Sequence, residues 1–269
     1  MRRLTGFDCA GAWCAASLDE GDTATGLLIV SGGNEIRSGA HAGQAALAAH
    51  FAALGHPVFR YDRRGVGESE GENGGFESAA ADLAAAVAAF RAEVPHLEHI
   101  VAFGNCDAAS ALALFHAGLA IDRLVLANPW VIEAADADDL PAPATIRSRY
   151  WARLKNPRSL IDLFTGRIDL RKLFAGLVRA TRHQPASALS GRVAAALHAA
   201  NLPVSILLAA RDTTAMAFAA AWKGSAFDGA RNRPDVAMTV LDSASHSFAG
   251  TDDRQWLLDE IGKALTAAR

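Results

Sequence analysis

Short apolar runs alternate with longer Ala-rich helical stretches along most of this chain. The apolar runs have the length of strands buried on both faces. They lie at Gly26–Ser31, Pro57–Asp62, His99–Phe103, Arg123–Asn128, Val204–Ala210 and Val236–Leu241. The helical patterns lie at Ala40–Leu54, Glu77–Glu93, Ala215–Trp222 and Asp253–Ala267. Strand–helix alternation at this spacing predicts a mostly parallel sheet with helices on both faces.

Two stretches depart from this alternation. Leu4–Asp8 and Trp13–Leu18 have the pattern of an antiparallel hairpin. The stretch from Val131 to Asn201 is too long for a loop, lacks strand patterns and contains segments with helical spacing. We interpret it as an inserted helical cap. The predicted domains are therefore a core of residues 1–130 and 202–269 and a cap of residues 131–201.

The run His99–Phe103 leads into Gly104-Asn105-Cys106-Asp107-Ala108-Ala109, which opens a helical pattern. A strand, a sharp turn with a nucleophile and a helix are typical of the nucleophile elbow in the α/β-hydrolase fold. The turn brings two backbones together, so the residues two before and two after the nucleophile must be small. Gly104 and Ala108 meet this requirement around Cys106. A single Cys is more often a small buried hydrophobic residue, but this pattern favours a thiol nucleophile.

Composition narrows the class of protein. The chain has 269 residues, of which 51% are hydrophobic and 20% charged, as expected for a soluble protein with a sizeable core. Its net charge of −3 provides no basis for nucleic-acid binding. Three cysteines argue against a disulfide framework and favour a reducing compartment. Without a signal-peptide pattern or an apolar run of about 18 residues, we expect a cytoplasmic protein.

No cofactor is expected from the motifs. Cys9 and Cys14 lack a second Cys/His pair at metal-ligand spacing, so we interpret them as ordinary residues of the hairpin and expect no metal. The stretch Asp62-x-Arg64-Gly65-x-Gly67-x-Ser69 contains Gly-x-Gly but lacks the third glycine of a dinucleotide site. It resembles a structural turn that flanks the active-site floor in many α/β-hydrolases.

A thiol with an ordinary pKa of about 8.5 needs a base or a cation to become a thiolate at neutral pH. His246 is the best base, because it follows the last strand pattern and precedes the terminal helix. Asp212 follows another strand pattern and completes the chain order nucleophile, acid, base. It also suits the N-cap of the next helix. Asp242 is the alternative acid, whereas Asn128, at another strand end, cannot act as a carboxylate.

An oxyanion hole needs two preorganised N–H donors. One is expected from the backbone of Asp107, at the start of the helix after the nucleophile. The other is expected from the loop Gly32-Gly33-Asn34, with Asn34 as the donor. We expect Gly33 and Trp130 to contact the substrate. For the Asp107 side chain two roles remain open, capping the helix or binding a hydrogen-bond donor on the substrate.

The cap is rich in basic residues. Eleven Lys and Arg stand between Pro141 and Ala200, against two acidic residues, Asp162 and Asp169. One interpretation is a solvated basic face on amphipathic helices. The other is peripheral contact with an anionic ligand or a membrane surface, with Leu160 and Phe164 among the apolar residues of that face.

The succession Gly32-Gly33, the Asp62–Ser69 turn, Gly104-x-Cys106-Asp107-Ala108-Ala109, Asn128-Pro129-Trp130, Arg211-Asp212 and Ser245-His246-Ser247-Phe248 resembles one α/β-hydrolase subfamily. It is similar to the exosortase A system-associated hydrolases of the first type, through nearly the whole chain. The resemblance implies a link to bacterial exopolysaccharide production and PEP-CTERM protein sorting, with no defined substrate. Asn34-Glu35-Ile36 departs from the pattern expected after the double glycine.

The resulting hypothesis is acyl transfer on a small-molecule ester or thioester. Cys106 attacks the carbonyl, His246 moves the proton, Asp212 orients the imidazole, and the amides of Asp107 and Asn34 bind the oxyanion. One alternative is a lactone-opening enzyme of the dienelactone-hydrolase type, which has a thiol but normally no large cap. Another is a binding scaffold without catalysis, since a fold alone does not establish function. The oligomeric state stays open.

Overall fold

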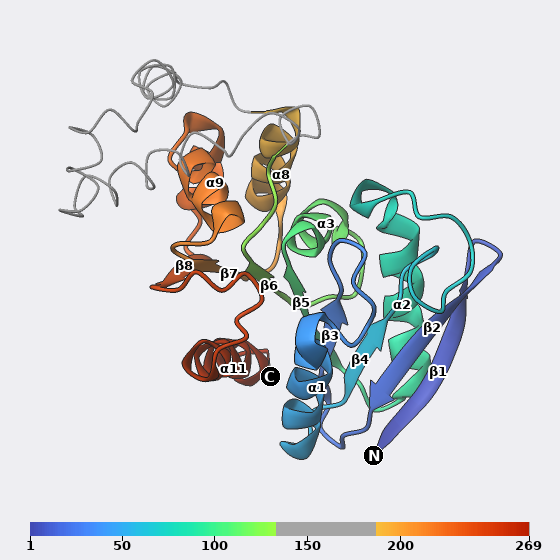
Figure 1. Ribbon diagram of the computed structural model, residues 1–269. Coiled ribbons are helices and arrows are strands. Elements are labelled where there is room, and N and C mark those ends of the chain that lie inside the picture. Colours follow the sequence, from blue (N-terminus) through green and yellow to red (C-terminus); the bar gives the residue numbers. More distant parts are fainter. Residues whose placement is uncertain (133–186, 269) are drawn as a thin grey trace, which may run out of the picture.

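Eight strands form a single sheet in the computed structural model, which describes residues 1–132 and 187–268 (Figure 1). The strands are β1 (Arg2–Cys9), β2 (Ala12–Asp19), β3 (Thr25–Val30), β4 (Val58–Tyr61), β5 (His99–Asn105), β6 (Arg123–Ala127), β7 (Val204–Ala209) and β8 (Val236–Leu241). Their order is β1-β2-β4-β3-β5-β6-β7-β8. β1 and β2 pair antiparallel, as do β2 and β4, and all other pairs are parallel. The predicted mostly parallel sheet and its N-terminal hairpin are confirmed.

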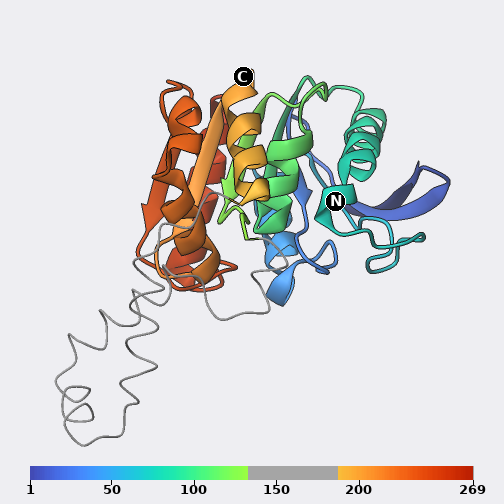
Figure 2. The ribbon, with the colours of Figure 1, turned by 90° about the horizontal axis from the view of Figure 1, so that it is seen from above.

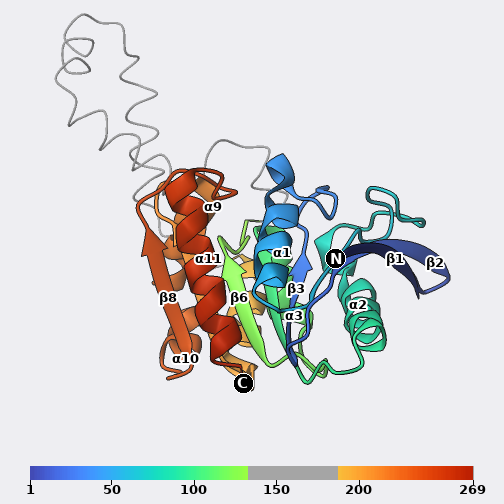
Figure 3. The same cartoon turned by 90° about the horizontal axis from the view of Figure 1, so that it is seen from below.

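Helices cover both faces of the sheet (Figures 2 and 3). One face carries α1 (Gly43–Ala53) and α11 (Thr251–Thr266). The other carries α2 (Ala80–Glu93), α3 (Asp107–Phe115), α8 (Ala188–Ala199), α9 (Thr213–Trp222) and α10 (Asp228–Arg231). Within the described residues, short 3₁₀ turns precede α1, α2 and α10, at Ala40–Ala42, Phe76–Ser78 and Ser225–Phe227. In the described parts of the chain, no helix has both the length and the apolar character needed to cross a membrane.

The alternation of side chains along β3 explains these two layers. Leu28 and Val30 pack with the residues of α2 and α3, whereas Leu27 and Ile29 pack with those of α1 and α11. Successive side chains of a strand point to opposite faces, so a strand buried on both sides must be apolar at every position. This is why the parallel strands read as continuous apolar runs in the sequence.

Most of the predicted cap, residues 133–186, lies outside the described residues and stays a prediction. The end of the predicted range forms α8, which packs beside α3 and α10. Leu189, Val193 and Leu197 are buried on one side of this helix. They join the core cluster that covers the sheet. The layer over the sheet therefore includes residues 188–199, which the sequence had assigned to the cap.

Candidate active site

The turn between β5 and α3 places Cys106 in a conformation that few non-glycine residues adopt, with φ 62° and ψ −127°. Two backbone hydrogen bonds hold it there. The Cys106 N–H donates to the Ala127 carbonyl over 2.9 Å, and its own carbonyl accepts from the Trp130 N–H over 3.2 Å. A Cβ at Gly104 would lie 2.8 Å from the carbonyl carbon of Ala108. The close approach expected for a nucleophile elbow is therefore present.

Trp130 supports this turn through its backbone. Its N–H contacts Cys106, and its carbonyl oxygen accepts a 2.5 Å hydrogen bond from the Ser110 hydroxyl. The indole is partly buried and packs against the core cluster of that face. In the described structure Trp130 thus contributes to the framework of the elbow, and the substrate contact expected for it stays a prediction.

Asp212 and His246 come together at the carboxyl ends of β7 and β8. Asp212 is 7% exposed and is the N-cap of α9, where its Oδ2 accepts a 3.0 Å hydrogen bond from the Ala215 N–H. The same oxygen lies 3.1 Å from Nδ1 of His246. One carboxylate oxygen of Asp212 therefore caps α9 and contacts the His246 imidazole.

The charges of this pair are mutually stabilised. Hydrogen bonds of the His246 imidazole to Asp212, and then to the side chain of Cys106, raise the pKa of His246 to about 10. Burial opposes ionisation of Asp212, but the hydrogen bonds from His246 and Ala215 outweigh it and lower the pKa of this carboxyl. The raised pKa therefore favours the protonated form of the His246 imidazole at neutral pH.

Asp242, the alternative acid, is engaged with Arg211 and not with the His246 imidazole. Its side chain is exposed to solvent and forms a 3.0 Å ion pair with Nε of Arg211. Asp212 is the carboxylate that reaches the His246 imidazole.

Two asparagine side chains hold the backbone of the His246 loop, a contact that the sequence analysis missed. The carbonyl oxygen of His246 accepts hydrogen bonds from Nδ2 of Asn105, over 3.0 Å, and from Nδ2 of Asn128, over 3.1 Å. Asn128 is fully buried, has φ 43°, and its Oδ1 accepts a 2.9 Å bond from the Ala209 N–H. Asn128, at the end of β6, therefore cannot act as the acid, and its side-chain amide instead links β6, β7 and the His246 loop.

The loop after β3 meets the side chain of Asp107. The Gly33 N–H donates to Oδ1 of Asp107 over 2.6 Å. A Cβ at Gly32 would lie 2.6 Å from the same oxygen and 2.7 Å from the backbone oxygen of Asn105, which cannot move aside, so a glycine is needed there. The side chain of Asn34 turns instead to Asn73, with 2.7 Å between Oδ1 and Nδ2. The loop amide that faces the elbow helix is thus that of Gly33, whereas the sequence favoured Asn34.

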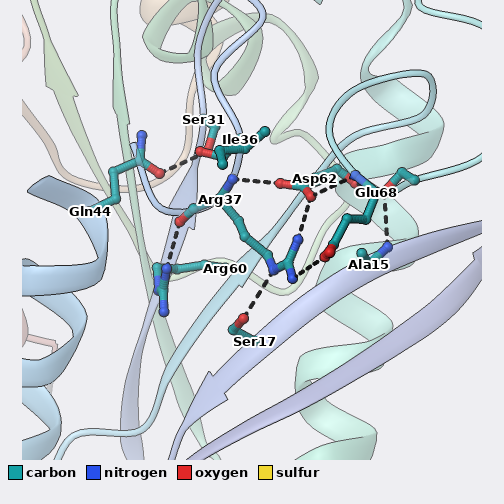
Figure 4. Close-up of polar contacts among 10 residues, drawn as sticks. Ala15, Ser17, Ser31, Ile36, Arg37, Gln44, Arg60, Asp62 and Glu68 are labelled. Carbon is teal, nitrogen blue, oxygen red and sulfur yellow. Dashed lines mark hydrogen bonds and ion pairs between the residues drawn. The ribbon is translucent and has the colours of Figure 1, made fainter. Parts of the chain in front are cut away.

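A buried polar network anchors both ends of this loop (Figure 4). At one end, the Ser31 hydroxyl donates to Oε1 of Gln44 over 2.7 Å. At the other, the backbone N–H and Nη1 of Arg37 each lie 2.5 Å from the fully buried carboxylate of Asp62. Nη1 of Arg60 donates to the Arg37 carbonyl over 2.6 Å. The loop that carries Gly33 is therefore held by side chains from α1 and β4 and from the turn after β4.

The turn from Asp62 to Ser69 is built around the Asp62 carboxylate. A Cβ at Gly67 would lie 2.4 Å from Oδ2 of Asp62, and Gly67 has φ 60°. The Ser69 hydroxyl donates to the Asp62 carbonyl over 2.6 Å and accepts a bond from the Ala15 N–H. This turn has the structural role expected from the sequence. Its partner Arg37 carries no motif that the sequence analysis could have used.

The two remaining cysteines differ from Cys106. Cys9 and Cys14 are buried in the hairpin, and burial raises the pKa of Cys14 to about 11. Cys106 is partly exposed. Across residues 1–132 and 187–268, no three His, Cys, Asp or Glu side chains are grouped to hold a metal ion.

The sheet, its helix layers and the elbow define an α/β-hydrolase. The profile of the family described as serine aminopeptidase, S33, matches residues 24–251, and the chain belongs to this family. A comparison with curated protein sequences finds no match.

Several solved structures share the fold. The esterase Pf2001 of Pyrococcus furiosus has a TM-score of 0.68 and 15% identity, covering 100% of this chain and 93% of that one. DcsB in complex with its substrate analogue has a TM-score of 0.67 and 15% identity, covering 100% of both chains. The α/β-hydrolase GrgF from Penicillium sp. sh18 has a TM-score of 0.66 and 16% identity, covering 100% of this chain and 99% of that one. At these identities the likeness concerns the fold alone.

Proposed function

We propose that this α/β-hydrolase cleaves an ester or thioester of a small molecule through a Cys106-His246-Asp212 triad. One observation carries the proposal. Nδ1 of the His246 imidazole lies 3.1 Å from Oδ2 of Asp212, and hydrogen bonding to the Cys106 side chain is the second cause of its raised pKa. A nucleophile, a base and an orienting acid in contact are the arrangement that nucleophilic acyl transfer requires.

The reaction follows from the charges of the pair. The Cys106 thiolate attacks the acyl carbon, and the carbonyl oxygen becomes an oxyanion. As the tetrahedral intermediate collapses, the bond to the leaving oxygen or sulfur breaks and the His246 imidazolium gives that atom its proton. The neutral imidazole then takes a proton from water, whose oxygen attacks the acyl-thioester. Release of the carboxylic acid restores the thiolate and the imidazolium.

For the oxyanion we assign the amides of Asp107 and Gly33. The Asp107 amide belongs to the first turn of α3, where N–H groups have no partner within the helix and the helix dipole favours negative charge. The Gly33 amide already binds a carboxylate oxygen beside the nucleophile. This supports Gly33 in place of Asn34 as the second donor.

The test is hydrolysis of p-nitrophenyl esters, CoA thioesters and lactones of different chain lengths by the wild type and its variants. Cys106→Ala, Cys106→Ser and His246→Ala should each lose at least about 10³-fold in kcat/KM. Cys106→Ser changes only sulfur to oxygen, so a loss of activity in this variant is attributable to the thiol rather than to the shape of the elbow. Activity that survives Cys106→Ala would contradict the thiol mechanism. Turnover of lactones alone would favour the dienelactone-hydrolase alternative, and no turnover of any substrate would favour a binding scaffold.

We also propose that the protein works with an exosortase and exopolysaccharide system in a reducing compartment. The proposal rests on the motif resemblance and on three free thiols. Deleting the gene in its host should alter the secreted polysaccharide or the processing of PEP-CTERM proteins, and a Cys106→Ala gene should fail to complement. Complementation by that variant would separate the biological role from catalysis.

The basic cap adds a proposal about binding. Peripheral contact with an anionic ligand or membrane surface should disappear when Arg147, Arg153, Arg171 and Lys172 are neutralised together. Flotation with anionic and neutral vesicles measures this. Unchanged flotation would leave the solvated-face interpretation.

A further inference from the structure

The side chain of Asp107 accepts the hydrogen bond of the Gly33 N–H, which the proposed reaction assigns to the oxyanion of the substrate. Its Oδ1 accepts the Gly33 N–H over 2.6 Å. Asp107 directly follows the nucleophile, and its own backbone amide is the other assigned oxyanion donor. A carboxylate oxygen thus already uses one of the two donors assigned to the developing oxyanion.

Stabilisation of the helix does not account for this contact. An acidic residue in the first turn of α3 interacts favourably with the helix dipole wherever its side chain points. The Asp107 carboxylate, however, reaches across to the loop after β3 and binds its backbone N–H at Gly33. A Cβ at Gly32 would lie 2.6 Å from Oδ1 of Asp107 and 2.7 Å from the backbone oxygen of Asn105, so glycine allows the loop to lie this close to the carboxylate.

The cationic side chains near the Asp107 carboxylate interact with other groups. The His246 imidazolium is already paired with Asp212. Arg63 donates to the carbonyl oxygen of Gly33, on the same loop. Among the described residues, no Lys, Arg or His forms an ion pair with Asp107. The residue next to Cys106 in the sequence therefore carries a negative charge that forms no ion pair with a described residue.

We propose that Asp107 determines which acyl groups the site accepts. The inference rests on the proposed function and deepens it. The Asp107 carboxylate competes with the substrate carbonyl for the Gly33 amide, so a productive substrate must displace it. Its charge also repels an acyl group that carries a free carboxylate near the reacting carbonyl. The preferred substrates are accordingly esters and thioesters of acyl groups without such a charge, and half-esters and half-thioesters of dicarboxylic acids are disfavoured.

A pair of thioesters with one leaving group tests this selection. S-butyryl-N-acetylcysteamine and S-succinyl-N-acetylcysteamine have four-carbon acyl groups and differ by one terminal carboxylate. Wild type should prefer the butyryl compound by roughly tenfold or more in kcat/KM. Asp107→Asn keeps the shape and an acceptor for Gly33 but removes the charge, so this preference should largely vanish. Asp22→Asn, at the opposite end of β3, is the matched control and should keep it.

A second variant tests the competition for Gly33. Asp107→Ala removes the acceptor altogether and frees the amide, so hydrolysis of the butyryl thioester should rise several-fold. A fall in butyryl turnover in a folded Asp107→Ala protein would show that the carboxylate supports the oxyanion hole, which would overturn the competition. An unchanged butyryl-to-succinyl ratio in Asp107→Asn would overturn the charge selection.

Alkylation separates failure of this inference from failure of the proposed function. Iodoacetamide and iodoacetate have nearly the same size and differ in charge, and both react with a thiolate without turnover. Mass spectrometry measures their rates on the peptide that contains Cys106. Asp107→Asn should raise the iodoacetate rate relative to iodoacetamide, about tenfold by the same argument. An unchanged alkylation ratio would overturn the charge selection even in a protein that hydrolyses nothing, whereas turnover by Cys106→Ala would overturn the proposed function.

Discussion

The side-chain amide of Asn128 donates a 3.1 Å hydrogen bond to the backbone carbonyl of His246. Its Nδ2 also lies 3.2 Å from Oδ1 of Asn105, the residue before Cys106. One buried amide therefore links the backbone around the imidazole to the strand that carries the thiol. The relative position of the two groups depends on a side chain that takes no part in the chemistry.

Replacing this amide by a carboxylate keeps the shape and reverses the hydrogen bonding. Asn128→Asp would place a buried negative oxygen against two acceptors, the His246 carbonyl and the Asn105 side chain. We expect a loss of about 2 kcal/mol or more in the free energy of unfolding and a fall in kcat. Urea unfolding and ester hydrolysis measure the two effects. Unchanged stability would mean that the loop is held by other contacts.

The Asp212 carboxylate is the largest cause of the raised pKa of His246. Asp212→Asn removes its charge and keeps an acceptor for the Ala215 N–H that it caps. The pKa of His246 should therefore fall well below about 10. NMR titration of the imidazole measures the shift. Asp242→Asn is the control, because Asp242 is exposed and paired with Arg211, and it should leave the titration unchanged.

The same pair makes stability depend on pH in a definite direction. Because the folded pKa of His246 is raised above 6.5, its contribution is fully present below that pH and is lost as pH rises through about 10. The folded pKa of Asp212 is lowered below 3.8, so its contribution is present above that value and is lost in more acid solution. Urea unfolding of wild type and His246→Gln should converge at high pH. A constant difference up to pH 11 would contradict the coupling.

Periodicity made most of the fold predictable, because alternating and continuous apolar patterns report which faces of an element are buried. The strand ends then indicated where Cys106, Asp212 and His246 would meet. The contacts of Asp107 with Gly33 and of Asn128 with His246 join residues 74 and 118 positions apart. Such polar partners leave no periodic trace, so Asn34 was favoured over Gly33. Residues 188–199 were assigned to the cap because the whole stretch from Val131 to Asn201 lacks strand patterns, and this does not distinguish a cap helix from one that covers the sheet.

The elbow tolerates no side chain at Gly104. A Cβ there would lie 2.8 Å from the backbone of Ala108, a group that cannot rotate away. Gly104→Ala should therefore lower the free energy of unfolding by about 2 kcal/mol. Gly191→Ala in α8 is a matched control, because no described residue outside its own helical turn lies within 4 Å of the new Cβ, and it should stabilise the protein by up to about 1 kcal/mol. Chemical denaturation of both variants measures the contrast, and equal effects would contradict the close packing of β5 on α3.

Arg37 holds the loop that carries Gly33, although it is far from Cys106 in the sequence and has no role in the proposed reaction. Its guanidinium bridges Asp62 and Glu68, with 2.5 Å to each carboxylate, and its Nε donates to the Ser17 hydroxyl. Arg37→Met should free the loop and leave the buried Asp62 carboxylate without its cation, so that kcat falls about tenfold or more. Arg37→Lys restores one charge but not the fork, and it should recover only part of the loss.

Two measurements distinguish general damage to the site from displacement of the Gly33 loop as the cause of a lower kcat in the Arg37 variants. The pKa of His246 depends on Asp212 and Cys106, which Arg37 does not contact among the described residues, so NMR titration of the imidazole should match wild type in both variants. Alkylation of Cys106 by iodoacetamide, which needs no oxyanion donor, should also be nearly unchanged. A parallel loss of alkylation and hydrolysis would mean that Arg37 supports the whole site rather than the loop that presents Gly33.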